Sequence, residues 1–154
     1  MRSPVDREYR VKINQASMLL LLLLSGGVMA QDGVTVTQAW SRAMPPGSAT
    51  AAIYLQLRNN GAGSLSLLGG SVKFAETVEV HQIKHKDGMM RMRRLDILEI
   101  PADSAIEFSP GGYHLMMFGL SETPAAGQVF TVQLRFEDGM TFDVPVTVRG
   151  VAEE

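Results

Sequence analysis

The sequence predicts an all-β domain, either a sandwich or a barrel. Short runs rich in β-branched, aromatic or alternating apolar residues recur along the chain. Turn signals separate these runs, and no stretch after the first 30 residues shows a convincing helical period of 3.6 residues. Many short strands with frequent turns are typical of sandwiches and barrels. No internal repeat and no second domain is visible, so we expect a single domain.

Eight strands are expected in chain order. They are residues 34–37, 50–57, 78–84, 89–93, 105–108, 114–118, 129–136 and 141–148. The turn signals between them are Pro45-Pro-Gly47, Asn59-Asn-Gly61, Asp87-Gly88, Pro110-Gly-Gly112, Pro124 to Gly127 and Asp138-Gly139. Pro145 lies inside the last run, and a proline cannot donate a hydrogen bond to a neighbouring strand. That strand is therefore expected at an edge.

The first 30 residues are predicted to be an export signal outside the fold. The start is basic, with Arg2, Arg7, Arg10 and Lys12. An apolar run over 18–24 follows, and Val28 and Ala30 occupy the positions that a signal peptidase reads. The run is shorter than the roughly 20 residues that span a bilayer. We expect a cleaved signal over 1–30 and a periplasmic domain over 31–154, with an uncleaved membrane tether as the alternative.

Composition excludes several function classes. Residues 31–154 hold 10 basic and 14 acidic residues, a formal charge of −4. This mild acidity, without a basic stripe, gives no support for nucleic-acid binding. The chain has no cysteine, which excludes thiolate zinc sites, iron–sulfur clusters, thiol catalysis and blue-copper centres. A lipid attached at a lipobox cysteine is excluded for the same reason.

Methionine is the informative residue type. Seven of the 10 methionines follow the predicted signal, and five of those seven lie in two short stretches, each close to a histidine. A thioether is a soft ligand and an imidazole an intermediate one, so together they favour Cu(I) over Zn(II), Mg(II) or Ca(II). Thioethers also have no proton to lose, so only the histidines would compete with protons for the metal.

The spacing of these residues indicates which of them share a strand face. His114 and Met116 are two residues apart, so on a strand their side chains project from one face. Leu115 and Met117 then face the other way, into the core.

His81 and Met92 flank a hairpin whose turn contains Asp87-Gly88. A two-residue loop places His81 opposite Arg94, with Met92 as its diagonal neighbour, and a four-residue loop places His81 opposite Met92. A three-residue loop would separate the two. The sequence does not show whether this hairpin adjoins the strand of His114.

The four residues also match the motif of a known family. Ten residues separate His81 from Met92, and 21 separate Met92 from His114-Leu-Met116. In this spacing the chain resembles the PCu(A)C periplasmic copper chaperones. The neighbouring segments also resemble that family: Ala39-Trp-Ser-Arg42, Tyr54-Leu55, Asn59-Asn-Gly61, Met89-Met-Arg-Met-Arg93, Ser109-Pro-Gly-Gly-Tyr-His-Leu-Met116 and Phe118-Gly-Leu120.

The resemblance implies a cupredoxin-like, Greek-key β-sandwich with a Cu(I) site formed by His81, Met92, His114 and Met116. It implies copper delivery to another protein, either a copper-centre subunit of cytochrome c oxidase or another copper chaperone. Contact with the membrane would be only through that partner. Two features depart from the pattern. Gln82 stands where some members have a methionine, and the residues up to Gly150-Val-Ala-Glu-Glu154 do not resemble the His- and Met-rich tail of some members, so whether a second copper ion binds stays open.

The remaining histidine and methionines have simpler interpretations. His85 lies in or beside a lysine-rich turn and is expected to be solvated, with a transient role in copper entry or beside the ligands as the alternative. Met117 and Met140 are expected to fill gaps in the packing. Met90 shares a strand face with Met92 and could be a spare ligand, although packing is the simpler interpretation. Met44 lies in a proline-rich loop that could cover a metal site.

Other functions stay open on the sequence alone. A copper buffer or resistance protein could have the same site, and only a transfer partner would distinguish it from a chaperone. A copper oxidase or oxygenase needs more nitrogen ligands than three histidines supply, so no enzymatic activity is expected. A metal-free, immunoglobulin-like module that binds proteins would leave the spacing as coincidence. A short basic cluster could dock an acidic partner, although a solvated strand face is the simpler interpretation: Arg91, Arg93 and Arg94.

Overall fold

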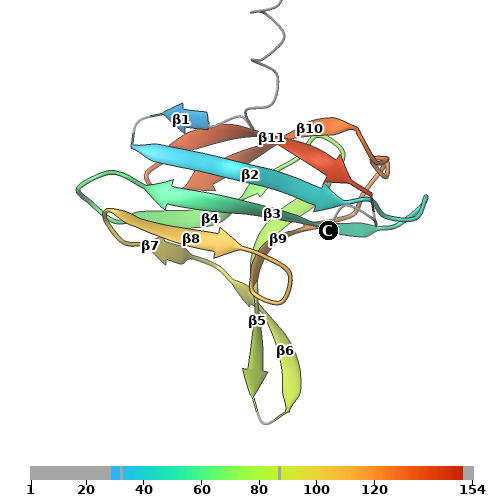
Figure 1. Ribbon diagram of the computed structural model, residues 1–154, viewed down its shortest axis with the longest axis horizontal. Coiled ribbons are helices and arrows are strands. Elements are labelled where there is room, and N and C mark those ends of the chain that lie inside the picture. Colours follow the sequence, from blue (N-terminus) through green and yellow to red (C-terminus); the bar gives the residue numbers. More distant parts are fainter. Residues whose placement is uncertain (1–28, 32, 87, 151–154) are drawn as a thin grey trace, which may run out of the picture.

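The computed structural model describes residues 29–31, 33–86 and 88–150. All regular secondary structure in these residues is β-strand (Figure 1). These residues include no helix able to cross a membrane. The strands are β1 (Met29–Gln31), β2 (Val34–Arg42), β3 (Thr50–Asn59), β4 (Leu65–Ser71), β5 (Thr77–Lys86), β6 (Met89–Leu95), β7 (Leu98–Ile100), β8 (Ser104–Phe108), β9 (Tyr113–Phe118), β10 (Val129–Phe136) and β11 (Thr141–Arg149). The predicted all-β class is confirmed.

All eight predicted strands are present, and β1, β4 and β7 are additional. Strand β7 has three residues, too few to show a period. Strand β4 contains Gly69 and Gly70, which weaken a strand pattern. Most of the predicted signal lies outside the described residues. Strand β1 spans its proposed cleavage point after Ala30, and the cleavage stays a prediction.

The strands form one continuous sheet in the order β6-β5-β9-β8-β3-β2-β11-β10-β4-β7, with β1 added to β2. The sheet closes into a barrel-like sandwich because β4 pairs with β10 and, at Gly70 and Val78, with β5. Closure requires a close approach at Gly69, whose φ is +134° and whose missing Cβ would lie 2.6 Å from the Val78 carbonyl oxygen. A side chain there would push β4 and β5 apart.

The last strand, β11, was predicted at an edge of the sheet, and this is wrong for the strand as a whole. Strand β11 lies between β10 and β2 in the sheet. Its parallel pairing with β2 begins only at Thr147, so the proline at 145 has β10 as its one neighbour. The missing N–H of Pro145 is therefore accommodated by a local gap in pairing.

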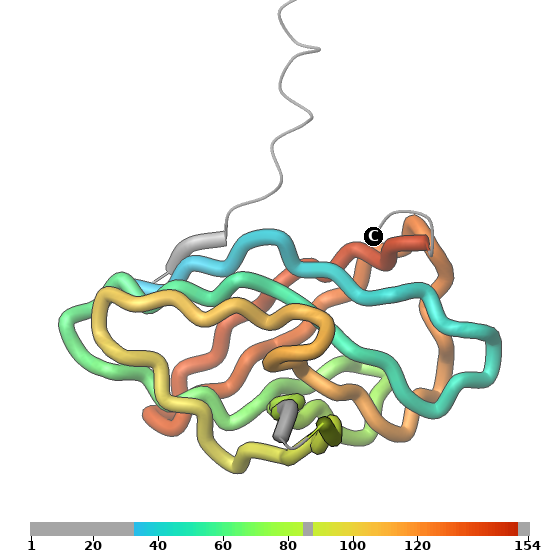
Figure 2. Tube along the Cα trace, turned by 60° about the horizontal axis from the view of Figure 1, so that its bottom comes forward, coloured from blue at the N-terminus to red at the C-terminus, as the bar shows by residue number. Residues whose placement is uncertain are grey.

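Alternation along β9 separates the core from the outer face, as the sequence predicts. Leu115 and Met117 are fully buried in the hydrophobic core, whereas Met116 is only partly buried. The hairpin of β5 and β6 extends beyond this core and projects from the body of the sandwich (Figure 1). Figure 2 turns the hairpin toward the viewer.

This alternation predicts different effects of truncation at adjacent positions. Leu115→Ala leaves a cavity in the closed core and is expected to lower the free energy of unfolding by about 2–5 kcal/mol. Met116→Ala removes a side chain that lines the outer face, so its loss should be markedly smaller. Urea denaturation of both variants at constant m-value checks this. Equal losses would contradict the assignment of the two faces.

Candidate metal centre

The sequence allowed a loop of two, three or four residues between β5 and β6, and the register of the two strands corresponds to the two-residue loop. Lys86 pairs with Met89 across residues 87 and 88, and Gly88 has a φ of +73°. In this register His81 lies opposite Arg94, and Met92 lies opposite Ile83. Because positions two residues apart share a face, Met92 is the diagonal neighbour of His81 on one side of the hairpin.

Strand β5 also pairs with β9, which joins the two halves of the motif. His81 lies directly opposite His114, and Glu79 lies opposite Met116. The centroids of the two imidazole rings are 5.8 Å apart. Residues opposed across an antiparallel pair project from the same face, so His81, His114 and Met116 share one side of the sheet. The adjacency that the sequence left open is therefore present.

The four motif residues differ in exposure. His81 and His114 are 8% and 3% exposed, whereas Met92 is 54% exposed. Met92, His114 and Met116 line one open pocket of about 240 Å³, and Met44 from the loop after β2 contributes to its wall. Buried His114 thus lines the pocket from inside and Met92 lies at its rim, while His81 is buried next to His114 and is not among the residues that line the pocket.

His81 has one ring nitrogen that the protein leaves without a partner. Its Nε2 is 2.9 Å from Oε2 of Glu79, and its Nδ1 is buried with no hydrogen-bond partner. In a neutral ring, Nε2–H donates to the carboxylate and Nδ1 carries the lone pair. A buried acceptor without a partner costs about 1–3 kcal/mol, so Nδ1 fits a ligand such as a metal ion.

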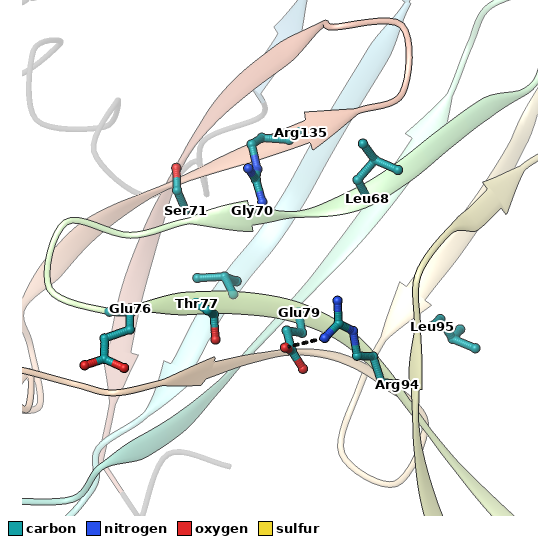
Figure 3. Close-up of a pocket in the computed structure, with 11 residues that line it drawn as sticks. Leu68, Gly70, Ser71, Glu76, Thr77, Glu79, Arg94, Leu95 and Arg135 are labelled. Carbon is teal, nitrogen blue, oxygen red and sulfur yellow. Dashed lines mark hydrogen bonds and ion pairs between the residues drawn. The ribbon is translucent and has the colours of Figure 1, made fainter.

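Glu79 fixes the orientation of this ring and was not identified from the sequence. Its other oxygen, Oε1, accepts a hydrogen bond of 2.9 Å from Nη1 of Arg94 (Figure 3). Nε of Arg94 is also 3.3 Å from a carboxylate oxygen of Asp96. Glu79 lies two residues before His81 on the same strand, and this spacing is the signal that could have revealed it. A carboxylate that holds the second ring nitrogen is typical of metal-binding histidines.

His114 is held by the backbone. Its Nδ1 is 3.4 Å from the carbonyl oxygen of Gly112, which assigns the lone pair of the neutral ring to Nε2. Burial lowers the pKa of His114 below its ordinary value of 6.5, and nearby His81 lowers it further, against the opposing effect of the Gly112 hydrogen bond. At neutral pH the ring is therefore uncharged and able to bind a metal.

The donor set is soft. Among the described residues, no group of three or more His, Cys, Asp or Glu residues could hold a metal ion. Two imidazoles and two thioethers share the face instead, which suits Cu(I) better than a hard cation.

The structure confirms some of the predictions for the other histidine and methionines and contradicts one. Met117 lies in the core and Met140 packs against it, as expected. Met90 is 70% exposed, so its expected packing role is wrong. It lies on an edge strand beyond the core, where nothing covers it. His85 lies opposite Met90 in the register, and its expected solvation stays a prediction.

Known proteins resemble this chain over most of its length. The model of the family described as "Putative lipoprotein LpqE-like" matches residues 34–148. A putative lipoprotein of Leifsonia xyli subsp. xyli is 36% identical over 119 residues, which cover 77% of this chain and 70% of that protein.

Solved structures show the same fold. The copper-bound PCuAC domain from PmoF2 superposes with a TM-score of 0.68 at 21% identity, over 80% of this chain and 98% of that one. The solution structure of the Cu(I) form of DR1885 from Deinococcus radiodurans has a TM-score of 0.60 at 29% identity, over 72% of this chain and 74% of that one. The resemblance to PCu(A)C proteins is thereby confirmed.

The lowered pKa of His114 predicts a pH dependence of the metal-free protein. The unfolded chain takes up a proton near 6.5, whereas the folded chain takes it up only at lower pH. The free energy of unfolding should therefore fall as the pH drops through this window and level off below the folded pKa. An NMR titration of the His114 ring gives the pKa directly. The free energy of unfolding of His114→Gln, measured over the same pH range, should lack the fall that is due to His114. A His114 ring that titrates above 6.5 would contradict the prediction.

Proposed function

The chain belongs to the LpqE-like family, and on this premise we propose that it binds one Cu(I) ion and delivers it to another protein. The observation that carries the proposal is the direct pairing of His81 with His114 beside two thioethers, with Nδ1 of His81 buried and unpartnered. Nδ1 of His81, Nε2 of His114 and the sulfur atoms of Met92 and Met116 would be the ligand atoms. Copper is the cargo of this protein, not a reactant that it transforms.

The chemistry of the site supports transfer. All four ligands are neutral, so no charge on the protein has to be neutralised when the ion leaves. Two ligands are buried and Met92 is exposed, which lets an incoming donor replace the outer thioether first. Stepwise exchange needs no redox change and no covalent bond to the protein. A chaperone therefore fits the site better than an oxidase does.

The relatives support copper as the cargo and export as the setting. The two solved relatives described above are a copper-bound domain and a Cu(I)-bound protein. The family and the Leifsonia xyli relative are described as lipoproteins, a class of exported proteins, although this chain has no cysteine to carry a lipid. We place the chain in the periplasm, and its resemblance to PCu(A)C chaperones supports the dinuclear copper centre of cytochrome c oxidase as the destination.

An anaerobic titration against a chromophoric Cu(I) chelator tests the binding. The protein should take up one equivalent, and Met92→Leu and His114→Gln should weaken binding by at least about tenfold, or 1.4 kcal/mol each. Met90→Leu is the matched control, since Met90 is an exposed methionine on the same face of the same strand. Failure of the parent protein to compete would exclude the chaperone and favour a metal-free binding module. Tight binding without release to any acceptor would indicate a buffer.

Glu79 should tune the affinity without touching the metal. Glu79→Gln weakens the hold on the His81 ring, and loss of such a partner typically lowers metal affinity about 10–100-fold. Asp96→Asn is the control, because it removes the same charge beside Arg94 but has no contact with His81. The chelator titration measures both variants. Equal effects of the two would mean that general electrostatics, and not ring orientation, is responsible.

A further inference from the structure

The two faces of the projecting hairpin carry different chemistry. One face holds His81, Ile83 and Met92, as described above. On the other face Lys84 pairs with Arg91, and Gln82 pairs with Arg93. Strand β6 ends the sheet order, and no strand pairs with its outer edge in the described part of the chain. The donor face and the cationic face therefore meet along one open edge.

The described residues do not neutralise the cations of the second face. Lys84, Arg91 and Arg93 are exposed and make no ion pair among the residues that the structure describes. Arg94, which points to the donor face, is instead paired with Glu79 and Asp96. The hairpin thus keeps its free positive charge on the face away from the copper ligands.

The positive charge is concentrated in this segment. Residues 81–94 contain five of the 10 basic residues that follow residue 30, and a single acidic one, although the chain from residue 31 has a net charge of −4. Lys84 and Arg91 lie directly opposite each other, and like charges in that arrangement destabilise a strand pair. The arrangement works against the stability of the hairpin, which favours a role in recognition.

We propose that this cationic face docks on a carboxylate-rich surface of the protein that accepts the copper. The inference rests on the proposed function and adds the chemistry of the partner. A partner that approaches the open edge of β6 meets Arg91 and Arg93 on one side and Met92 on the other. Docking therefore brings the acceptor's donors to the outermost ligand of the site. Charges at the rim of an interface act mainly on the association rate and on its salt dependence.

An anionic membrane is a less suitable occupant of this face. Membrane binding would account for the charge, but it would leave unexplained why the charge lies along the edge that exposes Met92. The acceptor of a chaperone is a protein, and a charged protein surface can fix the orientation that ligand exchange requires. Binding to vesicles is therefore included as an outcome of the test.

The experiment measures Cu(I) transfer from the loaded protein to two synthetic acceptor peptides with identical methionine and histidine donors. Glutamates flank the donors in one peptide and glutamines in the other, and a fluorophore reports copper arrival. We expect the glutamate peptide to be loaded about tenfold or more faster at low ionic strength, with the difference lost in high salt. The Arg91→Gln/Arg93→Gln variant should lose this preference while its copper affinity stays unchanged.

The matched control is Lys73→Gln/Arg135→Gln, which removes two exposed positive charges elsewhere on the protein. It should keep the preference, and an equal loss in both variants would overturn the inference, because net charge would then explain the effect. Equal transfer rates to the two peptides would overturn it as well, while the proposed function would stand on the chelator titration. If the unsubstituted protein bound no Cu(I), the proposed function itself would be contradicted.

Binding of the metal-free protein to the peptides, followed by anisotropy, and sedimentation with phosphatidylglycerol vesicles complete the test. Metal-free binding to the glutamate peptide that depends on Arg91 and Arg93 would support docking without reference to copper. Sedimentation that depends on the same residues, without preference for the glutamate peptide, would replace the protein partner with a membrane.

Discussion

The pairing of β5 with β9 is the interaction on which the site depends. It places His81 opposite His114 and brings Met116 to the same face. The same strand, β5, pairs on its other side with β6 and so brings Met92 to the donor face. One central strand therefore unites residues that lie far apart in the sequence. The closure of β4 onto β5 at Gly70 anchors the base of this strand, while the tip of the hairpin is left outside the core.

Local features of the sequence predicted the parts of the site that depend on alternation and on turns. The i, i+2 spacing predicted the shared face of His114 and Met116, and Asp87-Gly88 allowed the observed register of His81. The pairing of β5 with β9 involves residues more than 30 positions apart, and no local pattern encodes it. It could be expected only from the resemblance to a known family, because the spacing there reflects the whole fold.

The unpredicted features have physical reasons of their own. Strand β4 was missed because Gly69 is required by a backbone contact with Val78, a constraint that favours glycine and hides the strand pattern. Met90 was expected to pack because methionine usually does, but it lies on a strand that leaves the core. The ligand pattern of the sequence does not include Glu79, because this carboxylate holds the ring of a proposed ligand and not the metal itself.

The exposure of Met92 has a further consequence, which concerns oxidative damage. A thioether that is 54% exposed is open to oxidants, and conversion to the sulfoxide would replace the soft, apolar group of this proposed ligand with a polar one. Met117, sealed in the core, is protected from the same reaction. Under the proposed function, oxidation of Met92 would therefore disable Cu(I) binding while the sandwich stayed folded. Because methionine sulfoxide can be reduced enzymatically, a protein inactivated in this way would be repairable without being made again.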